Sequence, residues 1–188
     1  MNYNPAIRQQ RTTRLPGYDY AQHGAYFVTI CAQNRECLFG GVGVGEVELN
    51  NVGRLVYEEW LYTENIRPEV QLDEFVVMPN HIHGIITIRQ PEGAVGAHGR
   101  APLHAEHSLL YRKPRSLGSL IAGFKASATK RINQLRHTPG QPIWQRNYYE
   151  HIIRGETDLN RIRQYIRDNP ARWADGIYNP TIVSRSNS

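Results

Sequence analysis

Two apolar segments joined by a two-residue turn constrain the fold of this chain most strongly. Residues 75–78 (Phe-Val-Val-Met) and 81–88 (His-Ile-His-Gly-Ile-Ile-Thr-Ile) are rich in β-branched side chains. Pro79 and Asn80 between them are residues typical of turns. Strands joined by so short a connection pair in an antiparallel manner. The sequence therefore predicts a β-hairpin made of two core strands.

Two more core strands and three helices are predicted around this hairpin. The strand segments are β-branched and aromatic, whereas the helical segments carry apolar residues at a spacing of three to four. The predicted strands cover 25–32 and 142–153, and the predicted helices cover 51–66, 116–135 and 156–169. Asn51 and Ser116 are expected to cap the first two helices, and Pro170 to stop the third. Between the first strand and the first helix, the glycine-rich residues 40–45 and the alternating residues 46–49 predict a turn and a short strand.

The predicted core elements follow the order β-α-β-β-α-β and end with an additional helix. This order matches the ferredoxin-like unit, so we predict an α+β fold with an antiparallel sheet and two helices on one face. The C-terminal helix is the candidate cover for the other face. The 188 residues suit one domain, which we place at 21–178. The remaining predicted parts are a basic N-terminal arm (1–20), a long loop within the domain (90–115) and a tail (179–188).

Positive charge is concentrated in the C-terminal half of the chain. Residues 111–172 contain 13 Lys/Arg and 4 Asp/Glu, whereas the remaining residues contain 9 and 13. A cationic surface of this kind attracts phosphate backbones and releases their counterions. The distribution favours nucleic acid as the partner, although a solvated basic face would give the same count.

The chain shows no pattern typical of secretion or of membrane insertion. The arginines near the N-terminus precede no apolar run, and the longest apolar stretch is too short to span a bilayer. Cys31 and Cys37 fit no common zinc pattern, so we expect two buried, reduced thiols. These features predict a cytoplasmic protein.

The His81-Ile82-His83 motif is the first candidate functional feature. Residues two apart on a strand point to the same face, about 6.6 Å apart along the chain. Two imidazoles placed in this way can bind one metal ion at about 2.1 Å each. Two structural histidines bonded to their neighbours are the alternative, and the pair by itself does not decide between them.

Tyr165 on the last predicted helix is the second candidate. At about 100° per residue, Ile162 and Ile166 form the buried stripe, and Tyr165 lies at its edge. Arg161, Tyr165 and Asn169 form one row along the helix. A tyrosine hydroxyl with an arginine one turn before it suits a nucleophile that attacks a phosphate. A boundary tyrosine that merely covers the core is the alternative. If this helix packs on the histidine face, the two features together suit phosphoryl transfer.

Four motifs, which occur in the same order in a known family, support this chemistry. They are residues 26–30 (Tyr-Phe-Val-Thr-Ile), 77–84 (Val-Met-Pro-Asn-His-Ile-His-Gly), 144–154 (Trp-Gln-Arg-Asn-Tyr-Tyr-Glu-His-Ile-Ile-Arg) and 165–170 (Tyr-Ile-Arg-Asp-Asn-Pro). In these motifs the chain resembles the REP-associated branch of the single-tyrosine HUH transposases, of the insertion-sequence 200/605 type. The resemblance spans about residues 11 to 178.

The resemblance implies a mechanism and a partner. His81 and His83 would be the metal ligands, and Tyr165 would attack a phosphodiester of single-stranded DNA. The products would be a 5′-phosphotyrosine link and a free 3′-hydroxyl, so that a second transesterification could rejoin strands. The implied ion is Mg²⁺ or Mn²⁺, and the imidazole ligands favour Mn²⁺. The implied targets are short palindromic repeats that fold into hairpins.

Several residue roles stay open within this resemblance. In the insertion-sequence relatives a glutamine one turn after the tyrosine completes the metal site, whereas this chain has Asn169. Because it precedes Pro170, Asn169 is expected to leave helical geometry, so it is either a third ligand or a helix cap. Tyr148 and Tyr149 are the rival nucleophiles, but their predicted strand favours a packing role.

Basic residues around the second predicted helix are candidates for contacts with the DNA backbone. The candidate DNA-binding residues are Arg112, Lys113, Arg115, Lys125, Lys130, Arg131 and, on the last helix, Arg161. Each could equally be an ordinary solvated side chain.

Two other functions compete with the nickase and strand transferase. One is a DNA-hairpin-binding regulatory protein without catalysis. The other is a replication initiator or relaxase, although those proteins usually have larger domains. The sequence leaves open whether the protein acts as a monomer or a homodimer.

Overall fold

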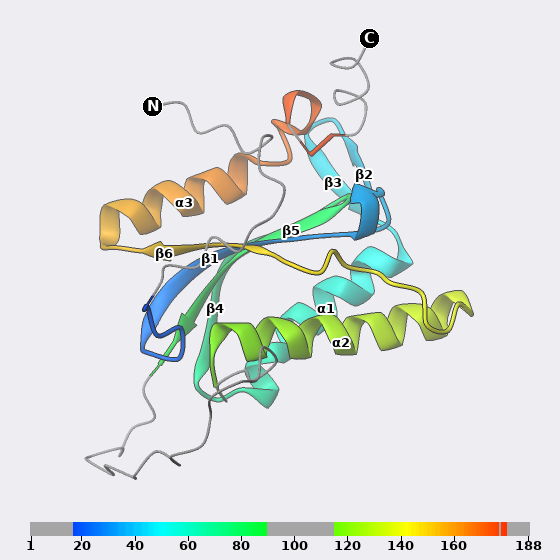
Figure 1. The fold of residues 1–188 in the computed structure, drawn as a ribbon. Coiled ribbons are helices and arrows are strands. Elements are labelled where there is room, and N and C mark those ends of the chain that lie inside the picture. Colours follow the sequence, from blue (N-terminus) through cyan, green and yellow to red (C-terminus); the bar gives the residue numbers. More distant parts are fainter. Residues whose placement is uncertain (1–16, 90–114, 177, 180–188) are drawn as a thin grey trace.

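A computed structural model of the protein describes residues 17–89, 115–176 and 178–179 (Figure 1). Most of the predicted N-terminal arm, of the loop at 90–115 and of the tail therefore lies outside the described residues. The same holds for Arg112 and Lys113, two of the candidate DNA-binding residues.

A four-stranded antiparallel sheet forms the centre of the molecule. Its strands are β1 (Gly24–Cys31), β4 (Val70–Met78), β5 (His81–Ile88) and β6 (Tyr149–Ile153). They lie side by side in the order β4-β5-β1-β6, and all neighbours pair antiparallel. This order is the one expected of a ferredoxin-like unit, and it confirms the predicted α+β class.

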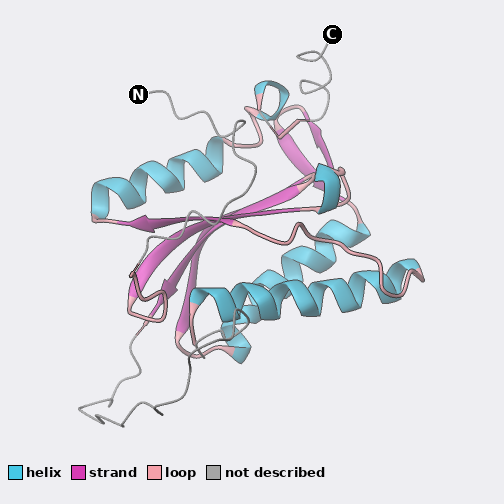
Figure 2. Cartoon of the chain, in the orientation of Figure 1, coloured by secondary structure: helices cyan, strands magenta, loops and turns pink. Residues whose placement is uncertain are grey.

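Helices cover both faces of the sheet, as Figures 1 and 2 show. Two long helices, α1 (Asn51–Ile66) and α2 (Leu117–Arg136), lie on one face, and α3 (Glu156–Asp168) lies on the other. Short 3-10 turns cover Gln33–Arg35 and Trp173–Asp175. A separate hairpin of β2 (Gly40–Gly43) and β3 (Glu46–Leu49) precedes α1. The C-terminal helix therefore covers the second face, as predicted.

The helix caps are close to those expected from the sequence. Asn50 rather than Asn51 caps α1, because its side chain accepts a hydrogen bond from the backbone N–H of Gly53 at 2.9 Å. Ser116 caps α2 through Ser119, as predicted. Asn169, by contrast, keeps helical backbone angles (φ −60°, ψ −41°) despite the following Pro170. The chain continues beyond it in a turn, in which Trp173 N–H donates to the Pro170 carbonyl.

The two faces of the sheet differ greatly in the amount of buried apolar surface. Under α1 and α2 the core contains 22 buried residues, centred on Tyr26, Trp60 and Ile82. Under α3 there are four, namely Phe27, Ile85, Ile162 and Ile166. Burial of apolar area is the main source of folding free energy, so the first face carries most of the stability. The second face is a thin apolar layer between α3 and the sheet, to which Phe27 of β1 and Ile85 of β5 contribute.

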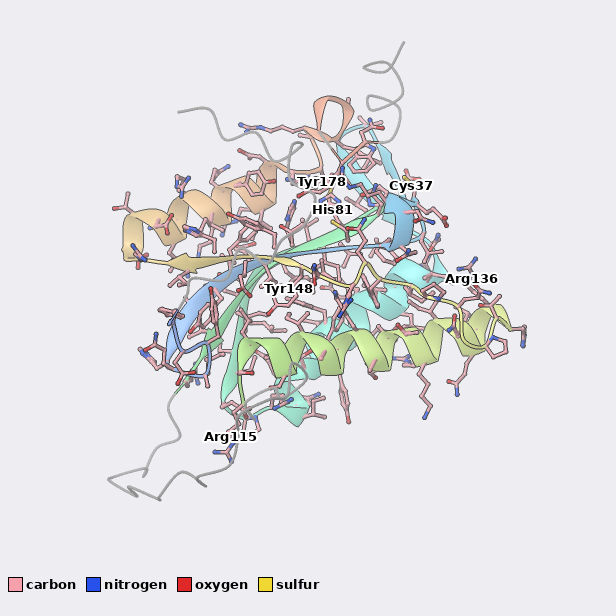
Figure 3. The ribbon with its side chains drawn as sticks, in the orientation of Figure 1. Cys37, His81, Arg115, Arg136, Tyr148 and Tyr178 are labelled. Atoms are coloured by element: carbon pink, nitrogen blue, oxygen red, sulfur yellow. The ribbon has the colours of Figure 1, made fainter. Side chains whose placement is uncertain are left out.

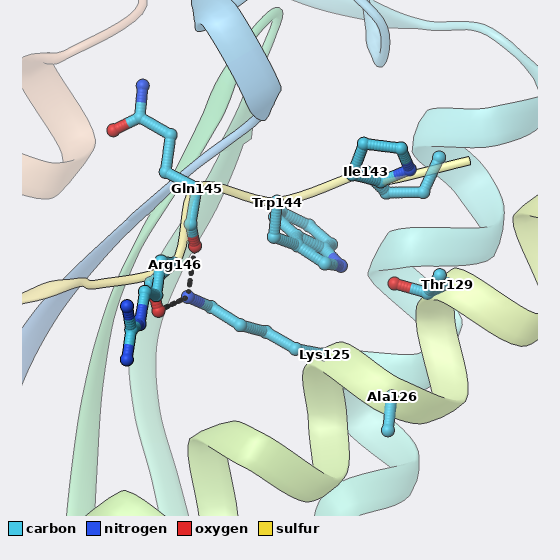
Figure 4. A pocket seen from close by; sticks show the side chains of 8 residues that line it. Lys125, Ala126, Thr129, Ile143, Trp144, Gln145 and Arg146 are labelled. Carbon is cyan, nitrogen blue, oxygen red and sulfur yellow. Dashed lines mark hydrogen bonds between the residues drawn. The ribbon is translucent and has the colours of Figure 1, made fainter. Parts of the chain in front are cut away.

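Two strands differ from their predicted lengths. β4 begins at Val70, five residues before the predicted start, and contains an irregularity between Leu72 and Phe75. β6 comprises only residues 149–153, because the segment before it forms an isolated bridge and side-chain contacts rather than a continuous ladder. There Trp144 bridges to Ala32, and Lys125 Nζ donates to the carbonyls of residues 145, 146 and 147 (Figure 4).

Two findings bear on the expected environment. In the described part of the chain, no helix is long and apolar enough to cross a membrane. Cys31 is buried, as expected, whereas Cys37 is exposed, which corrects the expectation of two buried thiols. Cys37 is exposed because it lies in the connection between β1 and β2, outside the sheet.

Candidate active site

The two histidines of β5 form a buried pair on the face that α3 covers. Their Nε2 atoms lie 3.0 Å apart, and the side chains are 0% and 1% exposed. β5 begins at His81, so the pair lies at the end of a central strand, close to the C-terminal segment (Figure 3). The same-face placement predicted from the sequence is therefore what the structure shows.

Asn80 fixes the tautomer of His81. Its amide nitrogen donates to the carbonyls of Arg35 (2.9 Å) and Tyr178 (2.8 Å). Its oxygen is therefore left to accept from His81 Nδ1, at 2.8 Å. With the proton on Nδ1, the lone pair of His81 is on Nε2 and points toward His83.

Thr29 holds the other histidine. Its Oγ1 atom lies 2.8 Å from His83 Nδ1, and Thr29 is opposite His83 in the β1–β5 register. A hydroxyl can donate or accept, so Thr29 supports either tautomer of His83. When His83 Nε2 carries the proton, it donates to His81. When His83 Nδ1 carries the proton instead, the Nε2 lone pairs of His81 and His83 converge on one point.

Burial keeps both imidazoles neutral. Desolvation lowers the pKa of His83 to about 3. The pKa of His81 is also lowered well below its usual value, by desolvation first and then by His83 and Arg35. Neutral imidazole is the form that binds a metal ion.

Tyr165 reaches this pair from α3. Its hydroxyl lies 3.3 Å from His83 Nε2, and its ring packs edge-on against Phe27 at 5.9 Å. Ile162 and Ile166 are buried beneath the helix, as the helical periodicity predicted. Tyr165 is 39% exposed, so its hydroxyl lies between the buried pair and solvent.

The rival tyrosines differ in position. Tyr148 packs against the core under α2, where Lys125 Nζ lies 5.7 Å from its ring. Tyr149 is on the α3 face, opposite Thr29 in the sheet, and its ring packs on Phe27. Of the three tyrosines, Tyr165 is the one whose hydroxyl is shown within hydrogen-bonding distance of the pair.

The C-terminal segment covers His81. The Tyr178 ring lies 4.4 Å from the His81 ring (Figure 3). The Trp173 ring stacks on the His81 ring at 6.2 Å. The Arg35 guanidinium lies 5.2 Å from the Tyr178 ring and helps to hold it. This cover explains why the pair is almost completely buried although it lies at the end of the sheet.

The donors of the pair fit a divalent cation. If two nitrogens each lie about 2.1 Å from one ion and the nitrogen–ion–nitrogen angle is about 90°, the nitrogens are about 3 Å apart. The Nε2 atoms of His81 and His83 have this separation. The other nitrogen of each ring is held by Asn80 or Thr29, as is usual for metal-binding histidines. Within the described ranges, however, no three His, Cys, Asp or Glu side chains cluster. Asn169 lies at the end of α3, where its N–H donates to the Ile166 carbonyl, and its role as a ligand stays a prediction.

The candidate DNA-binding residues are not gathered at the pair. Lys125, Lys130 and Arg131 are on α2, across the sheet from Tyr165. Lys125 donates to three carbonyls beside a groove between α2 and residues 142–146 (Figure 4), and Arg131 pairs with Glu58 and Glu59. Arg115 precedes α2 and is exposed. Their contacts with DNA stay predictions.

Arg161 belongs to a polar cluster at the start of α3. Asp158 accepts hydrogen bonds from Arg161, from His151 Nε2 at 2.8 Å and from the backbone of Arg154 at 3.2 Å. Partial burial alone would raise the pKa of Asp158, but these hydrogen bonds outweigh it and lower the pKa to about 2. Through the hydrogen bond between Asp158 and His151, this cluster connects the first turn of α3 with β6.

Sequence reasoning identified the pair and the tyrosine but not the residues that hold them. Asn80 was interpreted only as part of a turn, although its position next to His81 is a usable signal. Thr29 could not be assigned without the β1–β5 register. Trp173 and Tyr178 follow the last helix, in a stretch of the predicted domain to which no element and no role was assigned.

Comparison with solved structures places this arrangement in a known fold. A structure of a REP-associated tyrosine transposase bound to a REP hairpin matches with a TM-score of 0.56 and 20% sequence identity. The match covers 87% of this chain and 74% of that chain. The fold of this chain is therefore the fold of that transposase.

Sequence comparison identifies a relative over nearly the whole chain. An uncharacterized protein of Haemophilus influenzae (strain Rd) is 41% identical over 180 residues, which are 94% of this chain and 97% of that protein. The chain belongs to the same family as this Haemophilus protein. No protein-family model matches the chain.

Proposed function

We propose that this protein is a metal-dependent endonuclease and strand transferase for single-stranded DNA, with Tyr165 as the nucleophile. One observation carries the proposal: a helix tyrosine places its hydroxyl 3.3 Å from a buried pair of neutral strand histidines. The fold shared with a transposase that binds a REP hairpin supports a DNA substrate. We infer that hairpin-forming palindromic repeats are the targets of this chain too.

The proposed reaction is a transesterification. Tyr165 Oη attacks the phosphorus, the bond to the 3′-oxygen breaks, and a 5′-phosphotyrosine forms. The phenol loses one proton and the departing 3′-oxygen gains one. Because one phosphodiester bond is exchanged for another, the step needs no external energy source. Attack by the freed or another 3′-hydroxyl reverses the chemistry and rejoins the strands.

The residues around Tyr165 prepare this attack. Phe27 packs against the tyrosine ring and limits its rotation, while the buried stripe of α3 fixes the distance to the sheet. Positioning of the reacting groups is a large part of phosphoryl-transfer catalysis. The Tyr165 side chain as a whole is partly exposed, so it lies where a phosphate can approach it from solvent.

His81 and His83 would hold the divalent ion, and Asn80 and Thr29 would orient them. When bound, Mg²⁺ or Mn²⁺ supplies a Lewis acid for the non-bridging phosphate oxygens. The two imidazole donors favour Mn²⁺ over the harder Mg²⁺.

The segment over His81 must move before a phosphodiester can approach the pair. Trp173 and Tyr178 both contact the His81 ring, and the pair is nearly inaccessible beneath them. Tyr178 is attached through its carbonyl to Asn80 and through its ring to Arg35. DNA binding would therefore compete with these contacts.

Single-stranded oligonucleotides carrying the palindromes that flank the gene test the proposal. Incubated with Mn²⁺, the wild-type protein should form a covalent adduct visible on a denaturing gel. Tyr165→Phe and His81→Ala should both abolish it while still binding the hairpin. Tyr62→Phe, at an exposed tyrosine of α1, is the matched control and should react normally.

Tight hairpin binding without an adduct in any metal would instead assign the non-catalytic, regulatory function. An adduct that persists in Tyr165→Phe would reject the proposed nucleophile.

A further inference from the structure

β4 contains a bulge at Asp73 and Glu74, directly opposite α3. In the register with β5, Leu72 pairs with Ile86 and Phe75 pairs with Gly84, so these two acidic residues face the single residue Ile85. In a regular strand, neighbouring side chains point to opposite faces. A bulge breaks this alternation and re-aims side chains, and bulges are frequent next to active sites.

Both carboxylates of the bulge bind arginines of α3. Arg163 donates from Nε to Asp73 Oδ1 at 3.0 Å and from Nη2 to Oδ2 at 2.6 Å. Arg167 donates from Nε to Glu74 Oε1 at 2.9 Å, and its Nη2 contacts the same oxygen. Hydrogen bonding from Arg163 holds the pKa of Asp73 below its usual value, so this carboxylate stays charged. The two-point contact of Arg163 with Asp73 is geometrically specific.

The arginines and Tyr165 lie on opposite sides of the helix. At about 100° per residue, Arg163 and Arg167 flank the buried stripe on one side and Tyr165 flanks it on the other. The stripe itself is thin, since only Ile162 and Ile166 of α3 are buried. Apolar contact is non-directional and leaves rotation of the helix poorly defined.

We propose that Asp73 and Glu74 are positioning residues for the Tyr165 hydroxyl. They act through the two arginines of α3 and fix the rotation of this helix about its own axis. An atom about 6 Å from a helix axis moves by about 1 Å when the helix turns by 10°. A misplacement of this size can cost on the order of 100-fold in rate. The inference rests on the proposed role of Tyr165 as nucleophile.

The test compares the wild type with Asp73→Asn/Glu74→Gln and with the charge swap Asp73→Arg/Arg163→Asp. The proteins are labelled with 3-fluorotyrosine, and the Tyr165 resonance is assigned from its loss in Tyr165→Phe. In the double amide variant, this resonance should shift and adduct formation with Mn²⁺ and the oligonucleotide should slow by about 10- to 100-fold. Oligonucleotide affinity should change little, and the melting temperature should fall only slightly, because both ion pairs remain partly accessible to solvent and such pairs add little to stability.

The charge swap reverses the Asp73–Arg163 pair and leaves the Glu74–Arg167 pair intact, so it should keep the wild-type resonance and most of the wild-type rate. Glu58→Gln, which removes an ion pair with Arg131 on the other face, should change neither. A wild-type resonance and rate in the amide variant would overturn the inference. A slower rate with an unchanged Tyr165 resonance would also overturn the inference, as would a shifted resonance with an unchanged rate. If the wild type forms no adduct, the proposed function fails, while the resonance still shows whether the bulge sets the place of Tyr165.

Discussion

Thr29 Oγ1 lies 2.8 Å from His83 Nδ1 and connects β1 to the histidine pair of β5. Thr29→Val keeps the shape of the side chain but removes this hydrogen bond, leaving a buried imidazole nitrogen without its partner. Outer hydrogen bonds of this kind typically contribute 10- to 100-fold in metal affinity. We expect the Kd for Mn²⁺, measured by titration calorimetry, to rise by roughly that factor.

Thr63→Val is the matched control for this substitution. Thr63 is also buried, and its hydroxyl donates to the Glu59 carbonyl within α1. The Thr63→Val substitution should leave the Mn²⁺ affinity unchanged. Equal losses in the two variants would show that Thr29 acts only on stability.

Gly84 is required by the close approach of Trp60. A Cβ atom at this position would lie 2.5 Å from Trp60 Cζ2, and the indole is fully buried. We expect Gly84→Ala to lower the free energy of unfolding by about 1–3 kcal/mol in urea titrations. Gly123→Ala in α2, where a Cβ meets nothing within 4 Å, should instead raise it by about 0.5–1 kcal/mol. Loss of stability in both variants would contradict this packing argument.

The buried histidines predict a loss of stability in acid. Because desolvation lowers the pKa of His83 in the folded state to about 3, the unfolded chain binds more protons below pH 6.5. The stabilisation is thus complete above pH 6.5 and is lost as the pH falls toward 3. Between pH 7 and 5.5, in EDTA, His83 alone should lower the free energy of unfolding by roughly 1.2 kcal/mol.

The measurement for this prediction is the pH dependence of the urea midpoint in the wild type and in His83→Gln. The variant should have a shallower dependence, whereas His23→Gln, at an exposed histidine, should match the wild type. Parallel curves for the wild type and His83→Gln would contradict the neutral, buried state.

Tyr178 is predicted to slow access to the pair. An aromatic contact contributes about 1 kcal/mol, or roughly fivefold in an equilibrium, so Tyr178→Ala should raise the population of the uncovered state by about that factor. Adduct formation should accelerate to a similar extent at limiting DNA concentration. A slower reaction would mean that Tyr178 assists the substrate rather than covering the site.

The sequence was sufficient for the elements with strong local patterns. β5 was predicted to its observed bounds because Pro79-Asn80 and the apolar run mark both of its ends. The positions of His83 on the strand and of Tyr165 beside the stripe of α3 follow from the periods of 2 and 3.6 alone. The order of the elements made α3 the candidate cover for the second face, and the structure shows that this face carries the histidines.

What could not be predicted depends on register and on contacts between distant segments. The partners of the pair come from β1 and from the C-terminal segment, and no local pattern in the sequence connects Thr29 or Tyr178 with β5. The bulge at Asp73 arises from pairing with β5 and lies in a polar stretch that was not predicted as strand. Lys125 was a candidate for DNA contact because its charge is visible in the sequence, whereas the three carbonyls that it binds are not.

Tyr165 Oη is the proposed nucleophile of the cleavage reaction. The most direct measurement is mass spectrometry of peptides from the protein after reaction with the flanking oligonucleotide and Mn²⁺. We expect a nucleotide adduct, linked through a 5′-phosphate, on the peptide that contains Tyr165. An adduct on Tyr149 or Tyr148, with Tyr165 unmodified, would contradict it.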